Sequence, residues 1–130
     1  MIFVDSSVWI DYFNGQPTRP ARRLDGLLGS EPLAVGDLVL AEVLQGFRRD
    51  SDYRAARELL TSLTVLNVLN VDIALRSAEN FRLLRKKGIT VRKTVDSIIA
   101  TFCMHNQLWL LHSDRDFRPF EKHLGLQVVH

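Results

Sequence analysis

Short apolar runs alternate with longer stretches of helical periodicity along this chain. The apolar runs cover Ile2 to Asp5, Leu33 to Gly36, Val65 to Val68, Leu108 to Leu111 and Leu126 to Val129. They lack the polar alternation of half-exposed strands, as is typical of parallel strands that are buried on both faces. The pattern predicts an α/β fold of three α/β/α layers, with helices on both faces of a mainly parallel sheet of about five strands.

Helical stretches fill the intervals between the predicted strands. We expect a first helix from Ser7 to Phe13 and a second around Ala21 to Leu28. Asp37 and Thr94 each precede an apolar stripe of helical spacing and are predicted to be N-caps. No repeat or linker interrupts the pattern, so residues 1–130 are predicted to form one domain.

The composition of the chain limits the partners, the cysteine chemistry and the location that this domain can have. The net charge of +2 is too small to indicate a nucleic-acid partner by itself. The single cysteine, Cys103, excludes an intrachain disulfide and a cysteine-based zinc site. Met1 leads directly into an apolar strand without the features of a secretion signal, and no apolar run is long enough to span a bilayer. We therefore expect a cytoplasmic protein that does not enter the membrane.

Four carboxylates stand alone among apolar residues: Asp5, Glu42, Asp96 and Asp114. Asp5 ends the first predicted strand, Asp114 follows the fourth, and Asp96 lies in the first turn of the helix that leads to it. Open parallel sheets bind ligands beyond the carboxyl ends of their strands, so these three acids are expected to meet there. Glu42 must arrive from the helix after the second strand.

Isolated carboxylates of this kind indicate a metal site. An ionised carboxylate that leaves water costs several kcal/mol unless it pairs with a cation or binds a metal. Oxygen ligands without spaced Cys or His favour Mg²⁺ or Mn²⁺. Such a metal can polarise a phosphodiester and activate water. The number of ions, one or two, stays open.

Each acid also has a purely structural interpretation. Asp5 can cap the first helix, Glu42 can bond to a backbone donor, and Asp96 can favour the positive end of its helix. The Ser113-x-x-Asp116 spacing resembles a capping box. In an α-helix, residues two positions apart in the sequence lie about 200° apart around the axis. Asp114 and Asp116 are therefore not expected to face one ion.

A cluster of basic residues precedes Asp96. Arg92 and Lys93 lie nearest to it and are predicted to contact substrate phosphates. The cluster can also be explained as cations at the C-terminal end of a helix.

Four ordered segments of the chain resemble the PIN-domain ribonucleases, and in particular the VapC toxins of toxin-antitoxin pairs. The segments are Val-Asp-Ser-Ser-Val-Trp-Ile at 4–10, Ala-Glu-Val-Leu-Gln-Gly at 41–46, Thr-Val-Asp-Ser-Ile-Ile-Ala at 94–100 and Leu-His-Ser-Asp-Arg-Asp-Phe at 111–117. The resemblance implies a metal-dependent endoribonuclease whose acidic quartet matches the four isolated carboxylates. Asp116 matches a further acid of many members, and Ser6 the small hydroxyl residue after the first Asp. His112 departs from the Thr or Ser that many relatives carry.

The resemblance also implies partners. It implies an RNA substrate, a cognate VapB-type antitoxin and self-association as a homodimer. A groove for an antitoxin helix is expected from the first two helices and the exposed parts of Val39, Leu40 and Phe47. An alternative is a non-catalytic RNA-binding scaffold of the same fold, which the loss of an acid would signal. A phosphatase-like domain would need Asp-x-Asp after the first strand, where this chain has Asp5-Ser6-Ser7.

Overall fold

A computed structural model describes all residues, 1–130, and its centre is a four-stranded parallel sheet. The strands are β1 (Ile2–Val4), β2 (Leu33–Gly36), β3 (Thr64–Leu66) and β4 (Trp109–Leu111), in the order β3-β2-β1-β4. The sheet is parallel, as expected, and β1 and β2 are almost fully buried, whereas β3 at the edge of the sheet is largely exposed. The strand order reverses between β1 and β4, and this reversal determines where a ligand site can form.

The predicted fifth strand does not form. Of the segment Leu126 to Val129, only Val128 pairs with the sheet, through an isolated parallel bridge to Leu110. The Leu126 N–H donates instead to the Phe120 carbonyl at the end of the preceding helix. Because that hydrogen bond holds the start of the segment beside the helix, only its last residues reach the sheet, which therefore has four strands rather than five.

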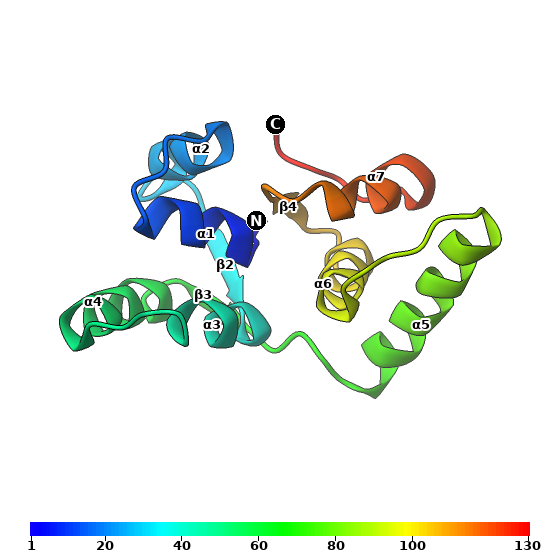
Figure 1. Cartoon of the computed structure of the whole chain (residues 1–130), viewed down its shortest axis with the longest axis horizontal. Coiled ribbons are helices and arrows are strands. Elements are labelled where there is room, and N and C mark those ends of the chain that lie inside the picture. The colour runs from blue at the N-terminus through cyan, green and yellow to red at the C-terminus, as the bar shows by residue number, and fades with distance from the viewer.

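Helices cover both faces of the sheet, which confirms the predicted α/β/α layers. They are α1 (Ser6–Phe13), α2 (Arg19–Leu27), α3 (Asp37–Leu44), α4 (Asp50–Thr61), α5 (Val71–Lys86), α6 (Thr94–His105), the 3₁₀ turn η1 (Arg115–Phe117) and α7 (Arg118–Leu124). Helices α1 to α4 gather on one side and α5 to α7 on the other (Figure 1). None of them is long and apolar enough to cross a membrane.

Helix ends differ slightly from the predicted ones. Asp37 and Thr94 are the first helical residues rather than N-caps. The Asp37 carboxylate accepts hydrogen bonds from its neighbour Leu38 N–H at 2.8 Å and from Val68 N–H at 3.1 Å. Asp37 therefore ties the chain after β3 to the start of α3, a contact between segments far apart in the sequence.

The core is continuous across the sheet. A single cluster of 26 buried apolar residues includes members of every strand except β3. Gly36, at the end of β2, lies where a Cβ would be 2.6 Å from Val68 Cγ2 and 2.8 Å from the Phe3 ring. Only glycine fits there, and its close packing fixes where α3, which carries Glu42, leaves the sheet.

Candidate metal centre

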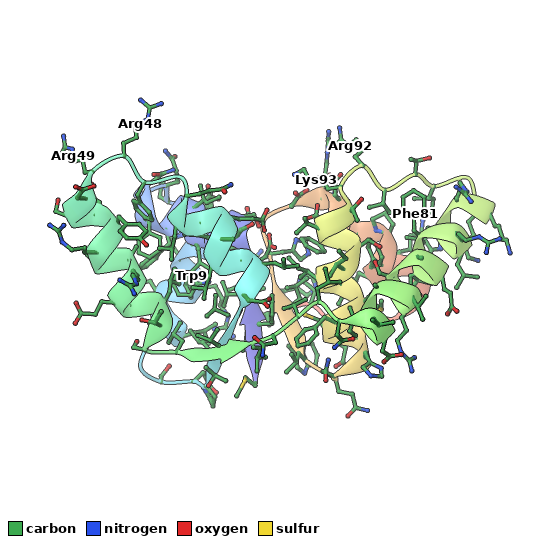
Figure 2. The ribbon with its side chains drawn as sticks, turned by 90° about the horizontal axis from the view of Figure 1, so that it is seen from below. Trp9, Arg48, Arg49, Phe81, Arg92 and Lys93 are labelled. Atoms are coloured by element: carbon green, nitrogen blue, oxygen red, sulfur yellow. The ribbon has the colours of Figure 1, made fainter.

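The candidate site lies at the carboxyl ends of β1 and β4, where the strand order reverses. Asp5 directly follows β1, and its backbone N–H donates to the Leu111 carbonyl at the end of β4 at 2.9 Å. Asp114 follows β4 by three residues. The first turn of α6 brings Asp96 to the same edge. In Figure 2, carboxylate oxygens gather between the two groups of helices, with Arg92 and Lys93 labelled beside them.

Asp5 uses its two oxygens differently. Oδ2 caps α1 by accepting from Ser7 N–H at 3.0 Å and from the Ser7 hydroxyl at 2.6 Å. Oδ1 is buried and has no hydrogen-bond partner. The capping and ligand interpretations of Asp5 are therefore compatible, because each needs only one oxygen.

Ser7 is a functional candidate that the sequence analysis missed. Its Oγ accepts from the Ser113 N–H at 3.0 Å while its hydroxyl donates to Asp5. One hydroxyl thus joins the end of β1 to the loop that carries Asp114. The signal in the sequence was the position of Ser7 two residues after a predicted N-cap, where the backbone and hydroxyl both reach the capping carboxylate.

Three carboxylates form the tightest group. One oxygen each of Asp96, Asp114 and Asp116 lies within 4.8 Å of the others. Asp96 is almost fully buried, and its Oδ2 has no hydrogen-bond partner. Asp5 and Glu42 lie outside this group of three. The structure therefore joins two of the predicted metal ligands, Asp96 and Asp114, to Asp116, which had been expected to face away from them.

The expected separation of Asp114 and Asp116 was wrong because the two do not share an α-helix. Asp114 is the extended N-cap of the 3₁₀ turn η1, and its Oδ1 accepts from the Asp116 N–H at 2.9 Å. The relation of 200° holds only inside a continuous α-helix. The cap is therefore Asp114 rather than Ser113, and the side chain of Asp116 turns toward Asp96.

Glu42 and Ser6 complete the carboxylate cluster. Glu42 is half-buried, with one oxygen that has no hydrogen-bond partner. Burial, followed by the negative charge of Asp5, raises its pKa, while the Ser6 side chain and the charge of Lys93 lower it. Ser6 is itself buried at the first position of α1. The charge of Asp5 and the side chain of Ser6 both act on Glu42, so the helix after β2 brings this carboxylate into their neighbourhood.

Burial and mutual repulsion make the site costly to ionise. Burial raises the pKa of Asp5 above its usual range. Burial, with the charges of Asp5 and Asp114, raises the pKa of Asp96 to about 7. A cation placed among these groups would favour their ionised forms. The cluster is thus electrostatically suited to a positively charged ligand.

Arg92 and Lys93 bridge the exposed side of the cluster. Arg92 lies 3.1 Å from Asp116 Oδ1, and Lys93 Nζ lies 3.0 Å from Asp114 Oδ2. Burial raises the pKa of Asp114, but hydrogen bonds from the Asp116 N–H and from Lys93 together outweigh it and hold the pKa below its usual value. Both cations were predicted to contact substrate phosphates, and in the structure they pair with two of the acids. Both remain more than half exposed, which leaves them accessible to a phosphate.

His112 stands where many PIN-domain sequences have a hydroxyl residue. Its Nδ1 accepts from the Asp114 N–H at 3.2 Å, and its ring packs on Phe117 with a centroid distance of 4.9 Å. Accepting at Nδ1 places the ring proton on Nε2 in the neutral form. Burial lowers the pKa of His112, so this neutral form dominates at pH 7. The hydrogen bond to the imidazole therefore helps to fix the backbone of Asp114.

The residues present fit a divalent metal. Three buried carboxylate oxygens, one each on Asp5, Glu42 and Asp96, have no hydrogen-bond partner. Buried polar atoms normally have a hydrogen-bond partner, so three buried oxygens without one indicate that this cluster binds a ligand. The donor set consists of oxygens only, which suits hard cations rather than zinc.

Comparisons with known proteins agree with this geometry. Ribonuclease VapC11 of Mycobacterium tuberculosis is 29% identical over 131 residues, covering 99% of this chain and 98% of the relative. A toxin-antitoxin complex from Klebsiella pneumoniae is similar with a TM-score of 0.70 at 25% identity, over 100% of this chain and 97% of that one. DNA-bound VapBC from Salmonella typhimurium gives a TM-score of 0.75 at 19% identity, over 98% and 96%. Residues 2–122 match the sequence model of the PIN domain, and this chain belongs to the PIN-domain family.

Proposed function

We propose that this protein is a metal-dependent endoribonuclease and the toxin of a type II toxin-antitoxin pair. The observation that carries the proposal is the set of three buried, unpartnered carboxylate oxygens at the switch point of the sheet. The full-length similarity to a protein named a VapC ribonuclease supports it. The whole chain, residues 1–130, would act as one PIN domain, with a single core beneath the site.

Asp5, Asp96 and Asp114 would hold the metal, with Asp116 as an additional ligand. The metal, Mg²⁺ or Mn²⁺, would neutralise phosphate charge and lower the pKa of an attacking water. Glu42, beside Asp5, has an unpartnered oxygen that can accept a proton from that water. Ser6, whose side chain lowers the pKa of Glu42, would help to keep that carboxylate ionised. Arg92 and Lys93 can exchange their carboxylate partners for phosphate oxygens of the RNA.

The direct test is cleavage of RNA by the purified chain. We expect cleavage of total RNA with Mg²⁺ or Mn²⁺, none in excess EDTA, and almost none by Asp5→Asn or Asp96→Asn. The variants must remain folded by circular dichroism. RNA binding without metal-dependent cleavage in the wild type would instead support a non-catalytic scaffold.

An apolar groove supports the antitoxin part of the proposal. A cavity of about 590 Å³ lies between α1 and α4 and adjoins one of about 140 Å³ that reaches Glu42. Phe13 and Phe47 line both cavities, and Ile10, which is 42% exposed, lines the smaller one. An amphipathic helix of a VapB-type antitoxin would bind here and cover the candidate site.

The groove differs from the expected one in its walls. Val39 is completely buried and is not available to a partner. Helix α2 lines neither cavity, and α4 supplies the far wall through Leu59. Val39 faces inward because it lies, with Val43, on the buried apolar face of α3. The groove that we propose for the antitoxin is therefore lined by α1, α3 and α4, and the expected Leu40 lines neither cavity.

Growth and copurification test this interaction. Expression alone should slow growth, whereas Phe13→Glu should abolish copurification with the protein encoded beside this gene without removing cleavage. For the homodimer we propose the exposed apolar residues Val71, Leu75 and Leu83 on α5, of which Val71 and Leu75 have the i, i+4 spacing of neighbours on one helix face. Sedimentation of wild type and Leu75→Glu would show whether these residues join two copies.

A further inference from the structure

A second hollow opens from the metal centre between α2 and α7. Its first part, about 470 Å³, is lined by Ser113, Asp114 and Arg115. Its second part, about 200 Å³, reaches Arg19 and Arg23 on α2. The two parts share Pro20, His112 and Arg118, so they form one continuous trough. In Figure 1, α2 and α7 lie on the upper side of the molecule, away from α3 and α4 and hence from the apolar groove.

The trough is strongly basic. Its four arginines, Arg19, Arg23, Arg115 and Arg118, are all exposed, and none takes part in an ion pair. Apart from Asp114, its only acid is Glu121, which lies 3.3 Å from His130 Nε2. Four unpaired guanidinium groups around one hollow create a local positive potential that the net charge of the chain does not reveal.

Arg19 opposes the local preference of its helix. Arg19 is the first residue of α2, Arg23 follows one turn later, and the first turn holds no acid. Cations at a helix N-terminus are unfavourable because the helix dipole is positive there. Residues that break a local rule without local compensation indicate a function, and a bound anion would reverse the sign of the interaction.

The position of the trough beside the candidate metal site indicates which ligand it binds. It begins at Asp114, where the proposed function places the phosphate that is cleaved, and leads away from it past guanidinium groups. No Phe, Tyr or Trp lines it for base stacking, and the exposed imidazole of His130 lies against Glu121. We propose that this arginine trough binds the backbone phosphates of the RNA strand next to the cleavage site, without reading its bases. This inference rests on the proposed ribonuclease function.

RNA binding by the full chain tests the proposal. In an Asp96→Asn background, which prevents cleavage, a fluorescent single-stranded 20-nucleotide RNA is titrated at several salt concentrations. We expect Arg19→Gln/Arg23→Gln to weaken binding about tenfold, as lost charge-assisted hydrogen bonds would. The slope of log K against log salt should flatten by about 0.7 for each phosphate contact removed. With Asp96 restored, KM should rise while kcat stays near that of the wild type.

A matched control removes two arginines elsewhere. Arg54 and Arg57 on α4 are exposed, free of ion pairs and outside the trough, so Arg54→Gln/Arg57→Gln makes the same charge change. Equal losses in both double variants would overturn the trough as a site. A trough variant that binds RNA normally but loses affinity for polyglutamate would also overturn it and indicate an acidic protein segment instead.

These failures differ from failure of the ribonuclease proposal. If wild type neither binds nor cleaves RNA, the proposed function fails and the trough proposal with it. If wild type cleaves RNA and the trough variant cleaves and binds equally well, only the trough proposal fails.

Discussion

The ammonium group of Lys93 lies 3.0 Å from Oδ2 of Asp114, the carboxylate oxygen of that residue that is not used in capping. A metal bound by Asp114 through this oxygen must compete with Lys93. Because Lys93 is 60% exposed, its flexible side chain can move away at little cost. The pair thus links metal binding to the position of a phosphate-binding cation.

Replacing Lys93 should separate these two roles. Lys93→Gln removes a positive charge from beside the cluster, so Mn²⁺ should bind several-fold more tightly, whereas KM for RNA should rise. Isothermal titration with Mn²⁺ and steady-state cleavage measure the two effects. Lys86→Gln, at the exposed end of α5, is the control and should change neither. Weaker Mn²⁺ binding by Lys93→Gln would contradict the competition.

Asp96 should make stability depend on pH in EDTA. Its pKa rises from 3.8 to about 7 on folding, so the folded state binds a proton that the unfolded state releases. Its contribution to the free energy of unfolding is complete below pH 3.8 and is lost as pH rises through 7. The asparagine of Asp96→Asn stays neutral at every pH, so the variant keeps this part of its stability above pH 7 and has no charge there to repel Asp5. At pH 8 in EDTA the variant should melt at a higher temperature than the wild type; a lower one would contradict the prediction.

Variants of Asp114 and Asp116 should separate capping from metal binding. Asparagine caps about as well as aspartate, so Asp114→Asn should lose activity while keeping stability. Asp114→Ala also loses the cap, at a cost of about 1 kcal/mol. Asp116→Asn removes a carboxylate of the group but no cap, so it should reduce activity without lowering Tm. Full activity of Asp116→Asn at limiting Mg²⁺ would exclude Asp116 from the site.

Gly36 should tolerate no side chain. Gly36→Ala brings a Cβ to 2.6 Å from Val68 and 2.8 Å from Phe3, so we expect a loss of about 1–3 kcal/mol in a urea titration. Gly26→Ala is the matched control, because that helical position has open space around it. It should be neutral or stabilising. Similar stability of the two variants would refute the close packing at the end of β2.

The sequence by itself determined the layers and the edge of the sheet where the acids lie. Apolar runs and helical stripes depend on local periodicity, which one chain displays directly. Asp5 and Asp114 could be placed at one edge because they follow parallel strands. Gly88 and Gly125 follow helical stretches rich in basic residues and have positive φ, because the need for a left-handed cap at a helix end is also local.

Only the tertiary structure decided how the carboxylates share their oxygens. The Ser7 hydroxyl joins the first turn of α1 to a loop residue 106 positions away, and Lys93 pairs with an acid 21 residues away. No periodicity encodes such contacts, because they depend on how separate elements pack. The conformation after β4 decided the rest: a 3₁₀ turn capped by Asp114 directs Asp116 toward Asp96, whereas an α-helix starting there would have turned it away.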